Sequence, residues 1–290
     1  RPVRPYLLDG SAIVTAMLLA FAIPPYSPWW LLLCGCFFAI IIAKHLFGGL
    51  GYNPFNPAMV GYAVLLISFP VNMTSWVLPL SLESFPHDLS NTLSLVFTGH
   101  LLDGTPILDA LTMASPLDTL KTELRLKHTV VEAFTSNDLY GFVGGIGWEW
   151  VNLAILAGGL WLLHKRIITW HIPVGLMAGM GLIAFMFNLI DSTHYASPFF
   201  HLSVGATMLG AFFIATDPVT ACTSNPARVV YGFLIGILAY IIRTWGGYPD
   251  GIAFGVLLMN MAAPTLDYYL QPRVFGHRRG KKHKHRSKKS

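Results

Sequence analysis

Residues 48–66 read GGLGYNPFNPAMVGYAVLL, and this stretch interrupts an otherwise apolar part of the chain. Its glycines and prolines predict a broken helix, with Asn53 and Asn56 at the break. A broken helix leaves backbone N–H and C=O groups without partners, and inside a membrane such groups must face protein, water or a ligand. Two interpretations of the asparagines stay open: their amides bind a planar heterocycle, or they cap the helix that follows.

The composition around this stretch excludes a soluble protein. Of the 290 residues, 54% are hydrophobic and only 11% are charged, against about 25% charged in a typical soluble domain. The mean hydropathy is +0.56. A soluble core could not bury this much apolar surface, and the same composition excludes disorder, a disulfide scaffold and a fibrous protein. We therefore predict an all-α polytopic membrane protein with broken helices and eight apolar spans. The spans lie at about 11–23, 28–43, 54–70, 144–163, 171–190, 199–216, 226–243 and 251–270.

Basic residues near the span ends set the expected orientation. Nine of the 19 Lys and Arg residues lie at or after Arg273, so the remaining chain is net acidic, which disfavours a nucleic-acid-binding protein. The other clusters of basic residues alternate between spans and are predicted to be cytoplasmic. Four parts follow. They are a transmembrane part (1–70), an extracytoplasmic loop without apolar periodicity (71–143), a second transmembrane part (144–272) and a basic, disordered cytoplasmic tail that contacts anionic lipid (273–290).

The three cysteines predict no metal site. Cys34 and Cys36 are two positions apart in an apolar run and point to different faces of a helix, and Cys222 stands alone. An iron–sulfur cluster usually needs four thiolates. We interpret all three as small packing residues.

The segment 109–120, DALTMASPLDTL, combines small residues with hydroxyl groups inside the predicted loop. From composition alone it is an ordinary loop in which a helix starts at Ser115-Pro116, because proline is favoured in the first turn.

Two later breaks resemble the first. Asp217-Pro218 ends the sixth span, where the carboxylate needs a partner or caps the next loop. The sequence GGYPD precedes the last span, in which AFGVLL (253–258) faintly echoes GYAVLL (61–66). Because those two spans cross in opposite directions, the echo favours an inverted repeat.

Seven stretches of the chain, in order, resemble the NqrB/RnfD family of membrane flavoprotein subunits. The family includes RnfD of the Rnf (or Rsx) ferredoxin:NAD⁺ oxidoreductase and, more distantly, NqrB of the sodium-pumping NADH:quinone oxidoreductase. The resemblance runs from about Asp9 to Gly280. It implies about ten spans in an inverted repeat, as in urea-transporter-like folds, so that part of the first repeat is expected to be missing at the front. The matching stretches are IIAKHLFGGLGYNPFNPAM, VLLISFPVNMTSW, ASPLDTLKT, WEWVNLA, GATMLGAFFIATDPVTA, RTWGGYPDGIAFGVLLMN and DYYLQPRVFGHRRG.

The resemblance implies a covalently bound FMN in the segment 109–120. The family signal is an Asp, two variable positions, a Ser or Thr, a small residue, Ala, and a final Thr or Ser that a dedicated flavin transferase joins to the FMN phosphate. Here it reads Asp109-Ala110-Leu111-Thr112-Met113-Ala114-Ser115. Two departures stand out: Ser115 replaces the usual threonine, and Met113 replaces a smaller residue. Because a serine hydroxyl forms the same phosphodiester, Ser115 is the predicted acceptor.

The resemblance also implies a second, noncovalent flavin, riboflavin, buried in contact with Asn53, Asn56 and Asp217. Electrons are expected to pass from the FMN-carrying G subunit through the FMN on Ser115 and the buried flavin toward the cytoplasmic side. The other implied partners are the NADH-side C subunit and the A and E membrane subunits. The complex connects ferredoxin and NAD⁺ across the bacterial inner membrane and moves Na⁺ or H⁺.

No residue is expected to act as an acid–base catalyst, so the chain is not catalytic alone. Asp191, His194 and Asp217 are candidates for the path of the coupling ion. Two alternatives remain: a flavin-free channel or transporter for small solutes, and a scaffold subunit that holds redox partners.

Overall fold

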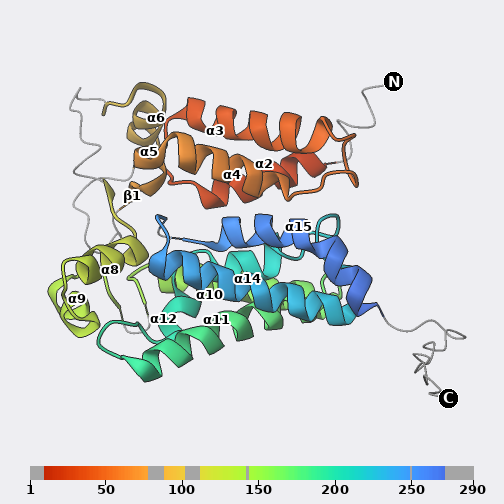
Figure 1. The fold of residues 1–290 in the computed structure, drawn as a ribbon. Helices are drawn as coiled ribbons and strands as arrows, with labels where there is room; N and C mark the ends of the chain where they lie inside the picture. The colour runs from red at the N-terminus through yellow and green to blue at the C-terminus, as the bar shows by residue number, and fades with distance from the viewer. Residues whose placement is uncertain (1–9, 78–87, 102–111, 142–143, 249, 272–290) are drawn as a thin grey trace, which may run out of the picture.

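The described part of the chain forms two layers of helices (Figure 1). The computed structural model describes residues 10–77, 88–101, 112–141, 144–248 and 250–271. The N-terminal layer contains α2 (Ser11–Ala22), α3 (Trp29–Cys36), the π-helix η1 (Phe37–His45) that continues α3, and α4 (Pro57–Ser68). The C-terminal layer contains α10 (Trp148–His164), α11 (His171–Ile190), α12 (Pro198–Ser203), α13 (Thr207–Leu209), the π-helix η2 (Gly210–Ile214), α14 (Asn225–Trp245) and α15 (Ile252–Leu270).

The mostly helical fold is confirmed, and each predicted span range contains helix. The sixth range is broken into α12, α13 and η2, with Gly205 at a φ of 70° between the first two. Contacts between α4 and α15 join the two layers. The start of α2 and the end of α15 lie at one end of the layers, opposite the end that carries α8 (Pro116–Arg125) and α9 (Val130–Ser136) (Figure 1).

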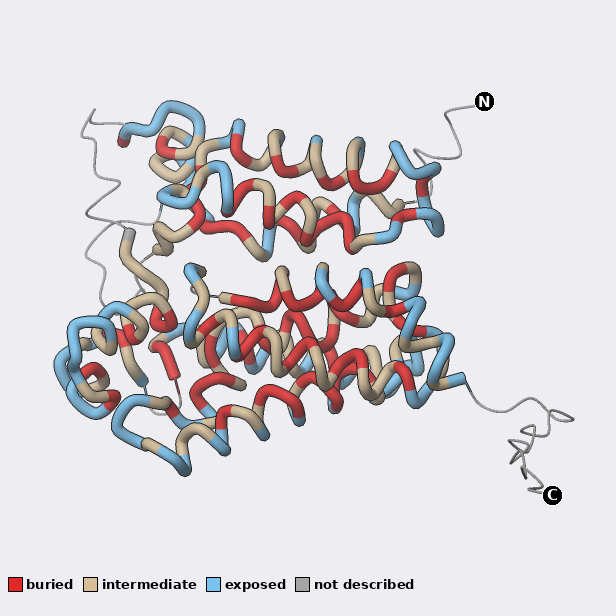
Figure 2. The backbone as a smooth tube through the Cα atoms, in the orientation of Figure 1, coloured by how far each residue is buried: buried red, intermediate tan, exposed pale blue. Residues whose placement is uncertain are grey.

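The outward faces of the helices are apolar. On α11, Leu182, Leu189 and Ile190 are at least half exposed, while Leu176 and Met180 on its other face are buried (Figure 2). A soluble protein rarely exposes so much contiguous apolar surface. By length and composition, α11 and α14 can each cross a membrane. This pattern is consistent with a membrane protein.

Glycines allow α11 and α14 to cross at very short range. A β-carbon on Gly179 would collide with the Phe233 carbonyl oxygen, and one on Gly236 would collide with the Leu176 carbonyl oxygen. Gly175 and Gly232 repeat this arrangement one turn away. Paired small residues four positions apart are a usual basis of helix contact in membranes. The spacing of these glycines is visible in the sequence, but the crossing was not predicted from it.

The prediction of an aperiodic loop over 71–143 is wrong for the described residues. They contain α5 (Pro70–Thr74), α6 (Leu89–Thr98), α8, α9 and a short antiparallel pairing of β1 (Trp76–Val77) with β2 (Thr112–Met113). Leu117, Leu120 and Leu124 recur at helical spacing on α8 and pack, with α9, against Phe200 of α12. The apolar positions were overlooked because polar residues separate them. The result is a small second core that fixes α8 against the C-terminal layer.

Candidate functional site

A cavity of about 90 Å³ lies where α8 meets both layers, and we call it the α8 cavity. Its walls are mainly apolar and aromatic. Side chains that line it include Met59 and Tyr62 from α4, Trp76 from β1, Trp148, Val151 and Ile155 from α10, Ser115 at the start of α8, and Ile252 and Ala253 from α15.

Ser115 is the N-cap of α8 and lines this cavity. Its Oγ accepts a hydrogen bond from the Asp118 backbone N–H at 3.3 Å, and Pro116 occupies the first helical position. The expected helix start at Ser115-Pro116 is therefore confirmed. The first turn of a helix presents free N–H groups and the positive end of the helix dipole, so it favours a bound anion.

The other residues of the predicted flavin signal are only partly described. Ala114 precedes Ser115 directly, and Thr112 pairs with Val77 through β2, although nothing is described of the Thr112 side chain. Asp109 lies outside the described residues altogether.

Hydrogen bonds hold α8 in place on the C-terminal layer. Lys121 Nζ donates to the carbonyl oxygens of Gly246 and Tyr248 at 2.5 and 3.0 Å. Tyr140 donates from its hydroxyl to the Pro116 carbonyl oxygen at 3.1 Å. Burial lowers the pKa of Lys121 below its usual range and raises that of Asp118. The middle of α8 is thus anchored to the turn between α14 and α15, and its start is anchored to Tyr140.

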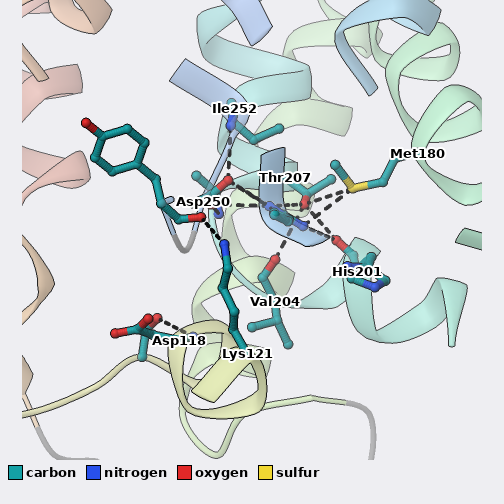
Figure 3. A network of polar contacts seen from close by, with 12 residues as sticks. Asp118, Lys121, Met180, His201, Val204, Thr207, Asp250 and Ile252 are labelled. Carbon is teal, nitrogen blue, oxygen red and sulfur yellow. Dashed lines mark hydrogen bonds and ion pairs between the residues drawn. The ribbon is translucent and has the colours of Figure 1, made fainter. Parts of the chain in front are cut away.

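A buried ion pair between Arg243 and Asp250 lies beside the α8 cavity (Figure 3). Arg243 of α14 lies 3.1 Å from Asp250, and only 1% of the arginine side chain is exposed. The guanidinium also donates to the His201 carbonyl oxygen at 2.8 Å and to the Thr207 hydroxyl at 2.9 Å. Asp250 accepts from the backbone N–H groups of Ala206 and Ile252.

Neither partner of this ion pair was predicted from the sequence. Arg243 ends an apolar span, where a charged side chain requires a partner. Asp250 ends the GGYPD break that precedes α15. The pair fixes the start of α15 and the glycine turn at Gly205, and Asp250 and Gly205 both line the α8 cavity.

One side chain in the α8 cavity has an unused hydrogen-bonding atom. Asn152 of α10 is 4% exposed and donates from Nδ2 to the Trp148 carbonyl oxygen at 3.1 Å. Its Oδ1 is buried and has no partner among the described residues. The sequence offered no signal for this, because the missing partner depends on how α10 packs.

A second cavity, of about 520 Å³, opens at the start of α4 and is called the α4 cavity. Asn53, Asn56 and Asp217, which were predicted from separate parts of the sequence, all line it, together with the buried side chain of Lys44. The structure therefore brings the three residues together. The loop after η1, the start of α4 and the turn after η2 supply them.

The polar groups of the α4 cavity also serve the backbone around them. Asn56 caps α4 by accepting from the Met59 N–H at 3.2 Å, and it donates to the Ile214 carbonyl oxygen. Asn53 donates to the Phe55 carbonyl oxygen, and Asp217 accepts from Val219 and Thr220. The capping alternative is thus correct for Asn56.

Asp191 and His194 do not join Asp217. They form an exposed turn just after α11, where the Asp191 carboxylate is 2.7 Å from His194 Nδ1. The hydrogen bonds from Thr193 and His194 lower the pKa of Asp191 to about 2. Asp217 follows η2 and lines the α4 cavity, whereas neither Asp191 nor His194 does. The three predicted ion-path residues are therefore not one cluster.

Comparisons with known proteins point to one family. The profile of the NQR2, RnfD, RnfE family matches residues 1–276. The chain is 56% identical over 277 residues to the D subunit of the ion-translocating oxidoreductase complex of Vibrio cholerae, which covers 93% of this chain and 79% of the relative. The corresponding D subunit of Pseudomonas aeruginosa is 53% identical over 283 residues, with 97% and 79% covered. That of Erwinia tasmaniensis is 51% identical over 287 residues, with 97% and 81% covered.

Proposed function

The chain belongs to the NQR2, RnfD, RnfE family, and on that basis we propose that it carries electrons through the membrane part of an Rnf-type complex. Its relatives are named as the D subunit of an ion-translocating oxidoreductase complex, and the chain is a subunit of such an electron transport complex. The finer proposal is that it connects ferredoxin and NAD⁺ through bound flavin and couples this transfer to movement of Na⁺ or H⁺.

The proposed FMN is attached through its phosphate to Ser115. The observation that carries this proposal is the position of the Ser115 hydroxyl at the start of α8, on a mainly apolar cavity with two tryptophans in its lining. The N–H groups and dipole of α8 favour the negative phosphodiester, while Trp76 and Trp148 supply aromatic surface for a planar ring. A flavin bound there exchanges electrons singly or in pairs. The residues of this chain bind and orient the ring and exclude water from it.

The proposed riboflavin occupies the α4 cavity. Lys44, Asn53 and Asp217 give this cavity polar groups beside the apolar walls of α2 and η2, the mixture that is typical of cofactor sites. Because the Asn56 amide caps α4, we assign it a supporting position rather than a direct hydrogen bond to the ring.

The proposed topology places eight crossing segments in the bacterial inner membrane. The end that carries α8 and α9 is extracytoplasmic, and the end where α15 terminates is cytoplasmic. The antiparallel contact between α4 and α15 supports an inverted repeat, since each helix follows a break and starts at a cavity. The proposed partners are the G, C, A and E subunits and a flavin transferase.

Denaturing electrophoresis of the complex tests the proposal. The band of this chain is expected to fluoresce under ultraviolet light in the wild type and in Ser115→Thr, and to lose its fluorescence in Ser115→Ala. Ser203→Ala is a matched control, because Ser203 is a serine at the end of α12 that does not line the α8 cavity. If the wild-type band does not fluoresce but denaturing the complex releases flavin, the chain binds flavin without the proposed covalent bond to Ser115. A complex in which this chain holds no flavin would favour the channel or the scaffold.

A further inference from the structure

The α10 face of the α8 cavity carries a single amide side chain among aromatic and aliphatic ones. Trp148, Val151, Asn152 and Ile155 are spaced by three or four positions, so they share one face of the helix, and all four line the cavity. Asn152 therefore stands between apolar neighbours on the surface that a ligand in this cavity meets.

The chemistry of the Asn152 amide is fixed by its neighbour. The Trp148 carbonyl can only accept, so the group that faces it at 3.1 Å is the amide nitrogen. The amide oxygen is left as an acceptor without a donor among the described residues. A buried polar atom without a partner costs about 1–3 kcal/mol. A stable protein keeps such an atom where water or a ligand supplies the missing hydrogen bond.

The groove on the other side of Asn152 does not supply that donor. The described side chains there that carry polar groups are Glu149, Trp150 and Ser203, and none of them hydrogen-bonds to Asn152 Oδ1. The Glu149 carboxylate accepts from the Gly144 N–H at 2.8 Å, and the Ser203 hydroxyl donates to the Phe200 carbonyl oxygen at 3.3 Å. A ligand in the α8 cavity can supply the missing donor from the other side.

We infer that Asn152 Oδ1 accepts the N3–H of the isoalloxazine ring, while Trp148 lies against the ring one helical turn away. The inference rests on the proposed flavin at Ser115. In the oxidised ring, N3–H is the one N–H donor, and the neighbouring carbonyl oxygens and ring nitrogens are acceptors. The ribityl hydroxyls are the other donors of FMN, and the test below separates them from N3–H, because a bond from a ribityl hydroxyl leaves the N3–H vibration unchanged when Asn152 is replaced. Asn152 is a ring-binding residue, distinct from the acceptor of the phosphodiester.

The test compares covalently loaded variants of the complex by resonance Raman spectroscopy in H₂O and D₂O. The ring vibration that shifts when N3–H becomes N3–D reports the hydrogen bond at N3. Asn152→Leu is expected to keep the fluorescent gel band and to move this vibration to the position seen for flavin in an aprotic solvent. Asn152→Asp keeps an acceptor, so the vibration is expected to stay at the wild-type position or to move further in the hydrogen-bonded direction.

Asn188→Leu is the matched control, because Asn188 is a helical asparagine that donates to the Tyr195 carbonyl oxygen and does not line the α8 cavity. It is expected to leave the vibration unchanged. If Asn152→Leu leaves the vibration at the wild-type position while the gel band persists, water or a ribityl hydroxyl satisfies Asn152 and the inference is overturned. If Asn152→Leu does not insert, Asn152→Ser serves in its place, since its shorter side chain also withdraws the acceptor. A nonfluorescent wild-type band would instead defeat the proposed function itself.

Discussion

The α8 cavity includes the start of α8 and of α15, whereas the α4 cavity lies at the start of α4, and residues of α4 and η2 line both cavities. They differ in how their polar groups are used. In the α4 cavity, Asn53, Asn56 and Asp217 each hydrogen-bond to nearby protein groups. In the α8 cavity, Asn152 keeps an acceptor without a partner among the described residues, and the Ser115 hydroxyl stands at a helix start.

Position in a cavity is therefore a weaker sign of ligand binding than a missing hydrogen bond. The residues around the α4 cavity have structural roles that explain their presence without a ligand. In the α8 cavity, the unpartnered amide oxygen of Asn152 costs folding free energy, and no described residue offsets this cost with a hydrogen bond. Four changes to the chain test this contrast, and the most damaging one comes first.

Arg243→Met is expected to damage the α8 cavity most. It leaves the mostly buried Asp250 carboxylate without its cation, and removing one partner of a buried pair costs about 3–5 kcal/mol. Unfolding in mixed micelles measures the loss. Arg243→Met with Asp250→Asn removes both charges and is expected to recover most of the stability. An Arg243→Met protein as stable as the wild type would show that the pair does not hold the start of α15.

Gly236→Ala is expected to disturb both cavities together. The added methyl group meets the Leu176 backbone, so α11 and α14 must separate, which costs about 1–3 kcal/mol. The same unfolding assay measures the loss, and flavin content is expected to fall at both sites. Gly247→Ala is the control, because a β-carbon there meets nothing within 4 Å. Equal stability of the two variants would refute the close helix crossing.

Asn56→Ala is expected to cost about 1 kcal/mol, because it removes the cap of α4. Asn56→Ser retains an accepting oxygen at the cap without adding a charge to this buried position, and it is expected to keep most of the stability and the flavin content. Loss of noncovalent flavin in Asn56→Ser at unchanged stability would instead show that the amide contacts the ring. The contrast between the two cavities would then fail.

Asp191→Asn is expected to have the mildest effect and to leave both cavities unchanged. Because the folded-state pKa of Asp191 is about 2, below its usual value, its stabilising contribution is present above the unfolded pKa and is lost as pH falls through the folded pKa. Unfolding between about pH 5 and pH 2 is expected to differ between wild type and variant at the upper end and to converge at the lower end. A change in flavin content at neutral pH would count against the separation of this turn from the site.

Particular residues show how far the sequence could predict this molecule. Long apolar runs broken by Gly and Pro located the helices, because span length and helix breaking are local properties. The cluster of Asn53, Asn56 and Asp217 followed from family resemblance rather than from spacing. The partners Arg243 and Asp250 and the free oxygen of Asn152 were missed, since each depends on which helices meet. The start of the helix at 116–125 was predicted from Ser115-Pro116, but its apolar face was missed for a local reason, the separation of its leucines by polar residues.

Mass spectrometry of the peptide that bears Ser115, taken from the intact complex, decides whether this chain carries covalent FMN. The expected peptide is heavier by the mass of FMN less one water, with fragmentation placing the addition on Ser115. An unmodified Ser115 peptide recovered in full from an active complex would contradict the proposed tether.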